Sequence, residues 1–273
     1  MGNEFEEVMR TPHSRRAFLA RMSAAGLGVA ASSLLGGTLL TGCGGGNGGV
    51  AGPVGNVYPA AFGSGDIRIL NYALTLERLE ADLYRQALNV ATKKPIGAPL
   101  APIGNARATY LNGNSVPAGG LSGGFAAAGL LYLVQFTYVE AAHRDFLIAA
   151  ITGNGGTPVS ANPGGYRFPG GPGSDLKTIL TNIIPLEETG TRAYLGAVPD
   201  FASNTFLQVA GTISSTESRH SAAVRYLVNP DSVGPSRMSG DREVTSNPPS
   251  EETFEKFLTV QEVLSAASRT YFA

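Results

Sequence analysis

The chain has 273 residues, a formal net charge of −1 and 43% hydrophobic residues, which is enough for one large or two small globular domains. The near-neutral charge and the lack of a long basic run exclude nucleic acid as the main partner. A single cysteine excludes an internal disulfide bond.

The first 42 residues have the pattern of a bacterial export signal. Arg15 and Arg16 lie in the segment Ser-Arg-Arg-Ala-Phe-Leu, which resembles a twin-arginine signal, and an apolar stretch follows over 24–40. That stretch leads to Leu-Thr-Gly before Cys43, which is similar to a lipobox, the cleavage site that precedes a lipidated cysteine. An uncleaved membrane span is the weaker alternative, because about 17 residues is the lower limit for crossing a bilayer. We predict cleavage after residue 42 and lipidation of Cys43, with a free reactive thiol as the alternative for this cysteine.

Residues 43–65 begin with the predicted lipidated cysteine and continue as a glycine-rich segment, which is typical of a flexible tether. A lipid anchor on such a tether keeps a domain at a membrane surface without a spanning helix. We therefore expect an exported protein that is anchored to the membrane on the extracytoplasmic side of the bacterial cell envelope. The twin-arginine route carries folded proteins, which agrees with metal insertion before export.

The first long helix is expected from Asp66 to about Val90, because apolar residues recur there at helical spacing. The segment 91–124 contains several prolines and glycines and no sustained period, so we expect a long connection there. We interpret it as an insertion that lies over one end of a helical bundle.

Four further helices are expected downstream, and their ranges are about 125–151, 174–195, 204–227 and, after a polar linker, 250–268 with Ser250 as the N-cap. Pro185 lies inside the third helix and predicts a kink or a late helix start just before Glu187. Gly190, one turn after Glu187, leaves space on the same face. The sequence thus predicts an all-α, up-down four-helix bundle of two αα hairpins over 66–228, followed by a linker and a short helix over 229–273.

Two Glu-x-x-His motifs carry the chemistry, Glu140 with His143 and Glu217 with His220. Residues three apart on a helix share a face, so each carboxylate and imidazole can bind one metal ion together. Every histidine downstream of the predicted leader belongs to such a motif. A single instance is better explained by a solvated helix face or a core histidine, but two instances on apolar stripes favour a metal site.

Two more glutamates precede these motifs, Glu77 and Glu187, each on an apolar helical stripe. The order Glu, Glu-x-x-His, Glu, Glu-x-x-His is the inward-pointing set that four-helix bundles use for a dinuclear site. Two divalent cations would neutralise four buried carboxylates, which are otherwise too costly to bury as charges. The predicted ligands are therefore Glu77, Glu140, His143, Glu187, Glu217 and His220, and they suit iron or manganese, although zinc also binds such atoms.

Neighbouring residues repeat in the two halves of the chain. Tyr84 follows Glu77 by seven residues and Tyr194 follows Glu187 by seven, which indicates an internal αα repeat and a pseudo-twofold site. This shared spacing selects Glu77 as the ligand and leaves Glu80, on nearly the same face, beside the site or as an alternative ligand. We interpret both tyrosines as core aromatics with a hydrogen-bonding hydroxyl, with electron transfer to the metals as the alternative. Glu188, next to Glu187, is expected to point elsewhere and to be solvated.

The chain resembles the ferritin-like superfamily, and within it the bacterial and plant ferritin-like family that includes desiccation-related proteins. The resemblance covers about 66–228 and lies in four ordered motifs, which are Asn-Tyr-Ala-Leu-Thr-Leu-Glu-Arg-Leu-Glu-Ala over 71–81, Tyr-Val-Glu-Ala-Ala-His over 138–143, Gly-Thr-Arg-Ala-Tyr-Leu-Gly-Ala over 190–197 and Glu-Ser-Arg-His over 217–220. It implies a four-helix bundle with metal ligands at the six positions named above. Pro185 and the insertion over 91–124 depart from the family pattern.

Two functions remain open at this point. The first is an exported di-metal oxidoreductase, ferroxidase-like or catalase-like, whose small partner is O₂ or a peroxide. The second is a non-catalytic envelope or stress lipoprotein that keeps the bundle for structural purposes or for binding a partner. An oligomer is compatible with the sequence, but a closed iron-storage cage is disfavoured by a lipid anchor on every subunit. Whether the chain is an enzyme is left undecided by the sequence.

Overall fold

The described residues form an all-α fold. This is a computed structural model, and it describes residues 55–111, 121, 125–171, 173–229 and 257–272. Within these ranges there is no β-strand, only an isolated bridge between Tyr166 and Phe272. The predicted fold class is confirmed. The predicted leader and most of the tether, with Arg15, Arg16 and Cys43, lie outside the described residues.

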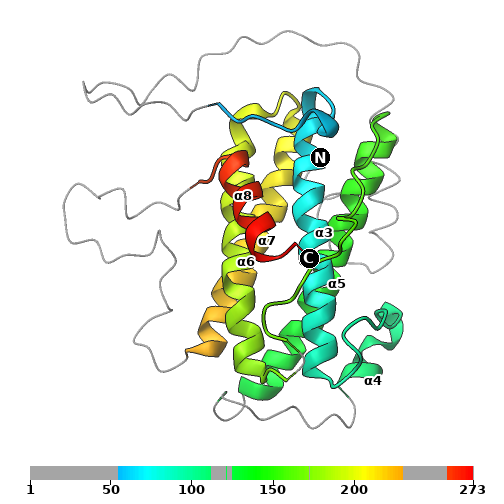
Figure 1. The fold of residues 1–273 in the computed structure, drawn as a ribbon, viewed down its shortest axis with the longest axis vertical. Coiled ribbons are helices and arrows are strands. Elements are labelled where there is room, and N and C mark those ends of the chain that lie inside the picture. The colour runs from blue at the N-terminus through cyan, green and yellow to red at the C-terminus, as the bar shows by residue number, and fades with distance from the viewer. Residues whose placement is uncertain (1–54, 112–120, 122–124, 172, 230–256, 273) are drawn as a thin grey trace, which may run out of the picture.

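Four long helices make up the bundle (Figure 1), and they are α3 (Gly65–Ala91), α5 (Phe125–Gly153), α6 (Leu176–Ala197) and α7 (Asn204–Val228). Each predicted end lies within two residues of the observed one. The main contacts join α3 to α5 and α6 to α7, and fewer contacts join α3 to α6 and α5 to α7. The bundle is therefore two αα hairpins packed against each other.

Polar contacts fix where the helices begin. Asp175 caps α6 by accepting a hydrogen bond from the Thr178 N–H at 2.7 Å. The Asp66 carboxylate, in the first turn of α3, accepts from the N–H groups of Ala202 and Ser203 at 2.8 and 2.9 Å. Since Ser203 is the N-cap of α7, α3 and α7 begin at the same end of the bundle.

The connection from α5 to α6 runs along α3. Near the start of α3, Asn71 accepts a hydrogen bond from the Val159 N–H at 2.8 Å and donates to the Thr157 carbonyl at 3.0 Å. Farther along α3, Gln86 donates to the Tyr166 carbonyl at 2.8 Å. The connection therefore returns along the bundle, and α5 and α6 run in the same direction (Figure 1). Bundles with one long crossover have this arrangement.

The segment 91–124 is more ordered than the sequence indicates. It contains a 3-10 helix, η2 (Ile103–Asn105), and a short helix, α4 (Ala106–Tyr110). This part contacts α5, and the Tyr138 hydroxyl donates a 2.6 Å hydrogen bond to the Ala101 carbonyl. The sequence analysis predicts a long connection here and does not reveal these two short helices, because a five-residue helix is too short to show a period. Residues 112–120 and 122–124 lie outside the described residues.

Helix α6 passes through Pro185 without a late start. It begins at Leu176, and its first turns bury Leu176, Ile179, Leu180 and Ile183. An interior proline costs a helix about 3 kcal/mol, but the Asp175 cap and this apolar packing oppose that penalty. The predicted late start before Glu187 is therefore wrong, while the kink stays a prediction.

The last helix, α8 (Val260–Thr270), begins ten residues after the predicted N-cap Ser250. Its N-cap is Thr259, which forms a capping box with Glu262. Residues 257–259 are not helical, and 250–256 lie outside the described residues. α8 packs against α6, where a Cβ atom on Gly196 would lie 1.9 Å from the Leu258 carbonyl oxygen. This position therefore requires glycine.

Helix α5 is the only helix in the described ranges that is long and apolar enough to cross a membrane by length and composition. It also carries Glu140, which is fully buried, and it packs along α3. Core helices of soluble bundles have the same composition, so we interpret α5 as a core helix.

Candidate metal centre

The structure brings all six predicted ligands together inside the bundle. They come from all four long helices and form two groups of possible ligand atoms, each group lying within 4.8 Å. The four glutamates are completely buried. We call these six residues the carboxylate–histidine cluster, and they are Glu77, Glu140, His143, Glu187, Glu217 and His220.

The first group consists of Glu77, Glu140, His143 and Glu217. The His143 Nδ1 atom lies 3.0 Å from an oxygen of Glu140, 3.2 Å from one of Glu217 and 3.4 Å from one of Glu77. Three carboxylates from three helices therefore surround one imidazole nitrogen. The His143 side chain is only 15% exposed, so it does not point into bulk solvent.

The second group repeats this pattern with Glu140, Glu187, Glu217 and His220. The His220 Nδ1 atom lies 2.8 Å from Glu140 Oε1 and 3.4 Å from Glu187 Oε2. Glu140 and Glu217 belong to both groups, whereas Glu77 and Glu187 each belong to one. This is the pseudo-twofold arrangement that the internal repeat predicts, with two shared and two terminal carboxylates.

Several cluster atoms have no hydrogen-bond partner in the part of the chain that the structure describes. They are Glu77 Oε2, Glu140 Oε1, Glu187 Oε2, both carboxylate oxygens of Glu217 and His220 Nδ1. His220 Nδ1 and Glu140 Oε1 are 2.8 Å apart, yet they are not aligned as donor and acceptor. A buried polar atom without a partner destabilises the fold by about 1–3 kcal/mol. The concentration of such atoms in this one cluster therefore indicates that a ligand binds there. Four carboxylates and two imidazoles that converge in this way fit two divalent metal ions.

The carboxyl groups of the cluster have shifted pKa values, because they are buried close to one another and to the two histidines. Burial raises the pKa of Glu77, and burial together with repulsion from Glu140 and Glu187 raises the pKa of Glu217 well above its usual value. Burial also raises the pKa of Glu140, but the charge and hydrogen bond of His143 and the close approach of His220 outweigh burial and lower that pKa to about 2. These carboxyl groups thus differ in how strongly they hold a proton.

Both imidazoles have a pKa that is raised by the carboxylates around them. Burial lowers the pKa of His143, but the charges of Glu77 and Glu140 outweigh this effect and raise it well above 6.5. Burial likewise lowers the pKa of His220, and the close approach of the Glu140 and Glu187 carboxylates raises it to about 9. Protons and metal ions therefore compete for the same atoms.

Two tyrosines orient the terminal carboxylates across the bundle. The Tyr194 hydroxyl on α6 donates a 2.7 Å hydrogen bond to Glu77 Oε1 on α3. The Tyr84 hydroxyl on α3 donates to Glu187 Oε1 on α6. In both carboxylates the other oxygen, Oε2, is one of the atoms without a hydrogen-bond partner. Each tyrosine thus holds one oxygen so that the second one faces the cluster.

Two more glutamates lie near the cluster but belong to neither group. Glu80 is 2% exposed, and burial together with repulsion from Glu77 raises its pKa well above the usual value. A Cβ atom on Gly190 would lie 2.9 Å from Glu80 Oε1, so glycine provides the space that the sequence predicts.

The expectation that Glu188 is solvated was wrong. It forms ion pairs with Arg225 and Arg192 and is 14% exposed, because an arginine on the neighbouring helix faces it.

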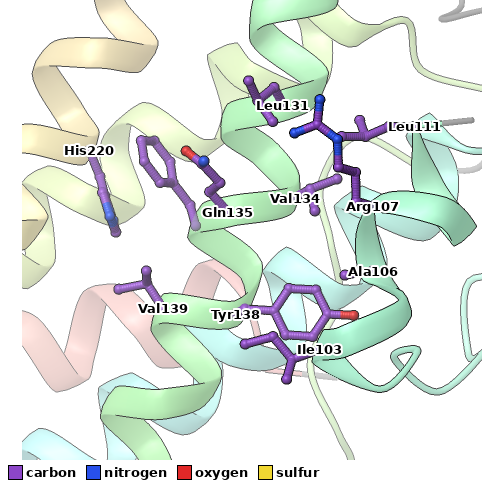
Figure 2. Close-up of a pocket in the computed structure, with 11 residues that line it drawn as sticks. Ile103, Ala106, Arg107, Leu111, Leu131, Val134, Gln135, Tyr138, Val139 and His220 are labelled. Carbon is purple, nitrogen blue, oxygen red and sulfur yellow. The ribbon is translucent and has the colours of Figure 1, made fainter. Parts of the chain in front are cut away.

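A pocket of about 430 Å³ reaches the cluster at His220 (Figure 2). Its walls come from η2, α4 and α5, and the Phe136 ring stacks on the His220 ring with centroids 3.7 Å apart. Sequence reasoning missed the pocket residue Arg107, because nothing in the unperiodic insertion marks it as part of a site. Only the fold brings α4 against α5.

Comparison with protein families identifies the domain. A family model described as the ferritin-like domain matches residues 65–230. A comparison with curated proteins finds no match to this chain.

Proposed function

The chain belongs to the family of ferritin-like domains, and we propose that it binds two divalent metal ions, iron or manganese, at the carboxylate–histidine cluster. The observation that carries this proposal is the convergence of buried atoms without hydrogen-bond partners from four helices. Glu140 and Glu217 would be shared between the metals, with Glu77 and His143 on one side and Glu187 and His220 on the other. Two ions of charge +2 would balance the four carboxylates.

We further propose that the site performs redox chemistry with O₂ or a peroxide, as a ferroxidase-like or catalase-like centre. Bound iron or manganese would supply the electrons or accept them. The protein contributes a completely buried set of carboxylates, and a metal bound to them would be shielded from bulk water. Tyr84 and Tyr194 fix the orientation of the terminal carboxylates, so little reorganisation is needed when metal binds.

Export and membrane anchoring are part of the same proposal, and the sequence supports them. The paired arginines Arg15 and Arg16 and the Leu-Thr-Gly-Cys segment ending at Cys43 have the pattern of a lipoprotein exported in folded form. Metabolic labelling with a fatty acid tests this proposal. The wild-type chain should be labelled and Cys43→Ala should not, while replacing Arg15 and Arg16 by lysine should retain the chain in the cytoplasm.

Metal analysis of the full chain tests the dinuclear site. We expect two equivalents of iron or manganese per chain and a metal spectrum that changes when O₂ or peroxide is added. Glu140→Ala removes a carboxylate shared by both groups and should lower the content below one equivalent. Glu188→Gln is the matched control, since Glu188 is the neighbour of Glu187 on α6 but lies outside the cluster. Less than one equivalent, unchanged by Glu140→Ala, would instead support the non-catalytic lipoprotein.

A further inference from the structure

The pocket beside His220 has walls from two parts of the chain. The insertion contributes Ile103, Arg107 and Leu111, and α5 contributes Leu131 and Val134 among others. Figure 2 shows Arg107 near Leu111 and Leu131, with His220 at the opposite end of the group. Its volume of about 430 Å³ lies in the range of small-molecule sites, which is about 300–1,000 Å³.

Most of the described residues that line the pocket are apolar, and Arg107 is the one among them whose charge does not depend on pH. The Tyr138 hydroxyl is already hydrogen-bonded to the Ala101 carbonyl, which leaves Arg107, Gln135 and His220 as polar groups. None of the described residues that line the pocket is acidic, and no described carboxylate forms an ion pair with Arg107. A guanidinium is charged at all physiological pH values and binds a carboxylate through two parallel hydrogen bonds.

We propose that this pocket binds a small organic anion with an apolar body, such as a medium-chain carboxylate. The head group binds Arg107, and the body lies along the apolar wall of α5 toward Phe136. Because the Phe136 ring stacks on His220, the far end of the ligand lies next to a residue of the carboxylate–histidine cluster. The role of the ligand as a substrate rests on the proposed metal function, but its binding does not.

The composition of the pocket separates this class of ligand from others. An inorganic anion would use Arg107 and leave the apolar walls in contact with water. A neutral apolar molecule would use the walls and leave the guanidinium without a partner. A cation would be repelled by Arg107, and no acidic side chain among the described lining residues would offset that repulsion. Only a molecule with both an anionic group and an apolar body matches the guanidinium and the apolar walls together.

Calorimetric titration of the full chain tests the proposal with three probes, octanoate, acetate and 1-octanol. We expect octanoate to bind more tightly than either of the others. Arg107→Gln should weaken octanoate binding by about tenfold or more, since a hydrogen bond to a charged group contributes about 1.5–3 kcal/mol. The same change should leave 1-octanol binding unchanged. Arg269→Gln, an exposed arginine on α8, is the matched control and should alter neither.

A second variant tests the walls. Leu131 is half-buried, and Leu131→Trp fills the pocket, so it should abolish binding of both octanoate and 1-octanol. Octanoate that binds no better than acetate, or that is unaffected by Arg107→Gln, overturns the proposal. The titration is run on metal-free and metal-loaded protein. Octanoate binding without metal binding refutes the proposed function alone, and metal binding without octanoate binding refutes the pocket alone.

Discussion

Tyr194 on α6 donates a hydrogen bond to Glu77 on α3, and the two oxygens are 2.7 Å apart. The reciprocal bond runs from Tyr84 on α3 to Glu187 on α6. Each helix thus orients the carboxylate of the other, although neither pair is close in sequence. The pseudo-twofold symmetry therefore includes the residues that position the ligands as well as the ligands themselves.

Removing one of these hydroxyls should weaken one metal site more than the other. In Tyr194→Phe, Glu77 Oε1 loses its donor and the carboxylate can rotate away from the cluster. We expect the affinity for one of the two metals to fall by about 10–100-fold, which is typical when the partner of a ligand is lost. Competitive titration with a chelator measures both affinities. Tyr226→Phe, an exposed tyrosine on α7, is the control, and an equal loss in both variants would contradict the assignment.

A methyl group at position 190 should disturb the site. The Cβ atom of Gly190→Ala would lie 2.9 Å from Glu80 Oε1 and 3.4 Å from Glu217 Cγ, so these buried side chains must shift. We expect a loss of stability of about 1–3 kcal/mol, measured by chemical denaturation. Gly211→Ala on α7 is the matched control, because nothing lies within 4 Å of its Cβ position. There, alanine should stabilise the helix by about 0.5–1 kcal/mol.

The double variant Gly190→Ala/Glu80→Ala identifies the cause of that loss. Shortening Glu80 removes the atom nearest to the new methyl group, so part of the stability should return relative to Glu80→Ala alone. Strict additivity of the two changes would show that Gly190 is needed for another reason.

Much of this site could be predicted because its signals are local. The three-residue spacing in Glu140 and His143 and the seven-residue spacing of Glu77 and Tyr84 both follow from helix geometry. The same geometry locates the ends of the four long helices. The structure confirms the all-α fold, whereas metal binding by the cluster stays a prediction.

The features that were not predicted depend on contacts between distant segments. The ion pair of Glu188 with Arg225 joins α6 to α7, and nothing near either residue indicates it. Arg107 reaches its pocket only because α4 folds back on α5. The capping box and the approach of Leu258 to Gly196 determine where α8 begins. The pattern of apolar residues over 250–268 indicates neither the capping box nor this contact.

The stability of the metal-free protein should fall as the pH rises from about 6.5 to about 9. Burial lowers the pKa of His220, but the close approach of the Glu140 and Glu187 carboxylates outweighs burial and raises this pKa from 6.5 to about 9. A group whose pKa is higher in the folded state stabilises that state fully below its unfolded pKa, and this stability is lost as the pH passes the folded value. The loss is about 1.4 kcal/mol per pH unit for each proton.

Denaturation midpoints at several pH values, with and without bound metal, check this expectation. The raised pKa values of Glu77 and Glu217 act in the same direction, because these carboxyl groups also hold protons in the folded state. Metal ions take the place of the protons, so the metal-loaded protein should show a much smaller slope over this window. His220→Gln should reduce the slope of the metal-free protein. Parallel curves for the two forms would contradict a shared proton and metal site.

The contact at Gly196 should determine whether α8 stays attached to the bundle. A Cβ atom there would lie 1.9 Å from the Leu258 carbonyl oxygen, which is backbone and cannot rotate away as a side chain can. In Gly196→Ala the segment before α8 must move, and Val260 should lose the hydrogen bond that its N–H donates to Asn56 at 2.9 Å. We therefore expect fast hydrogen exchange throughout α8.

The metal content of the carboxylate–histidine cluster shows whether Gly196→Ala disturbs the bundle interior as well as α8. None of its six residues lies on α8, so Gly196→Ala should leave the metal content near two equivalents while α8 loses protection. Gly153→Ala, at the end of α5 with nothing within 4 Å of its Cβ position, is the matched control and should leave α8 protected. If Gly196→Ala removes metal and exposes α8 together, the helix supports the bundle interior. Retained protection of α8 would show that the backbone accommodates the methyl group elsewhere.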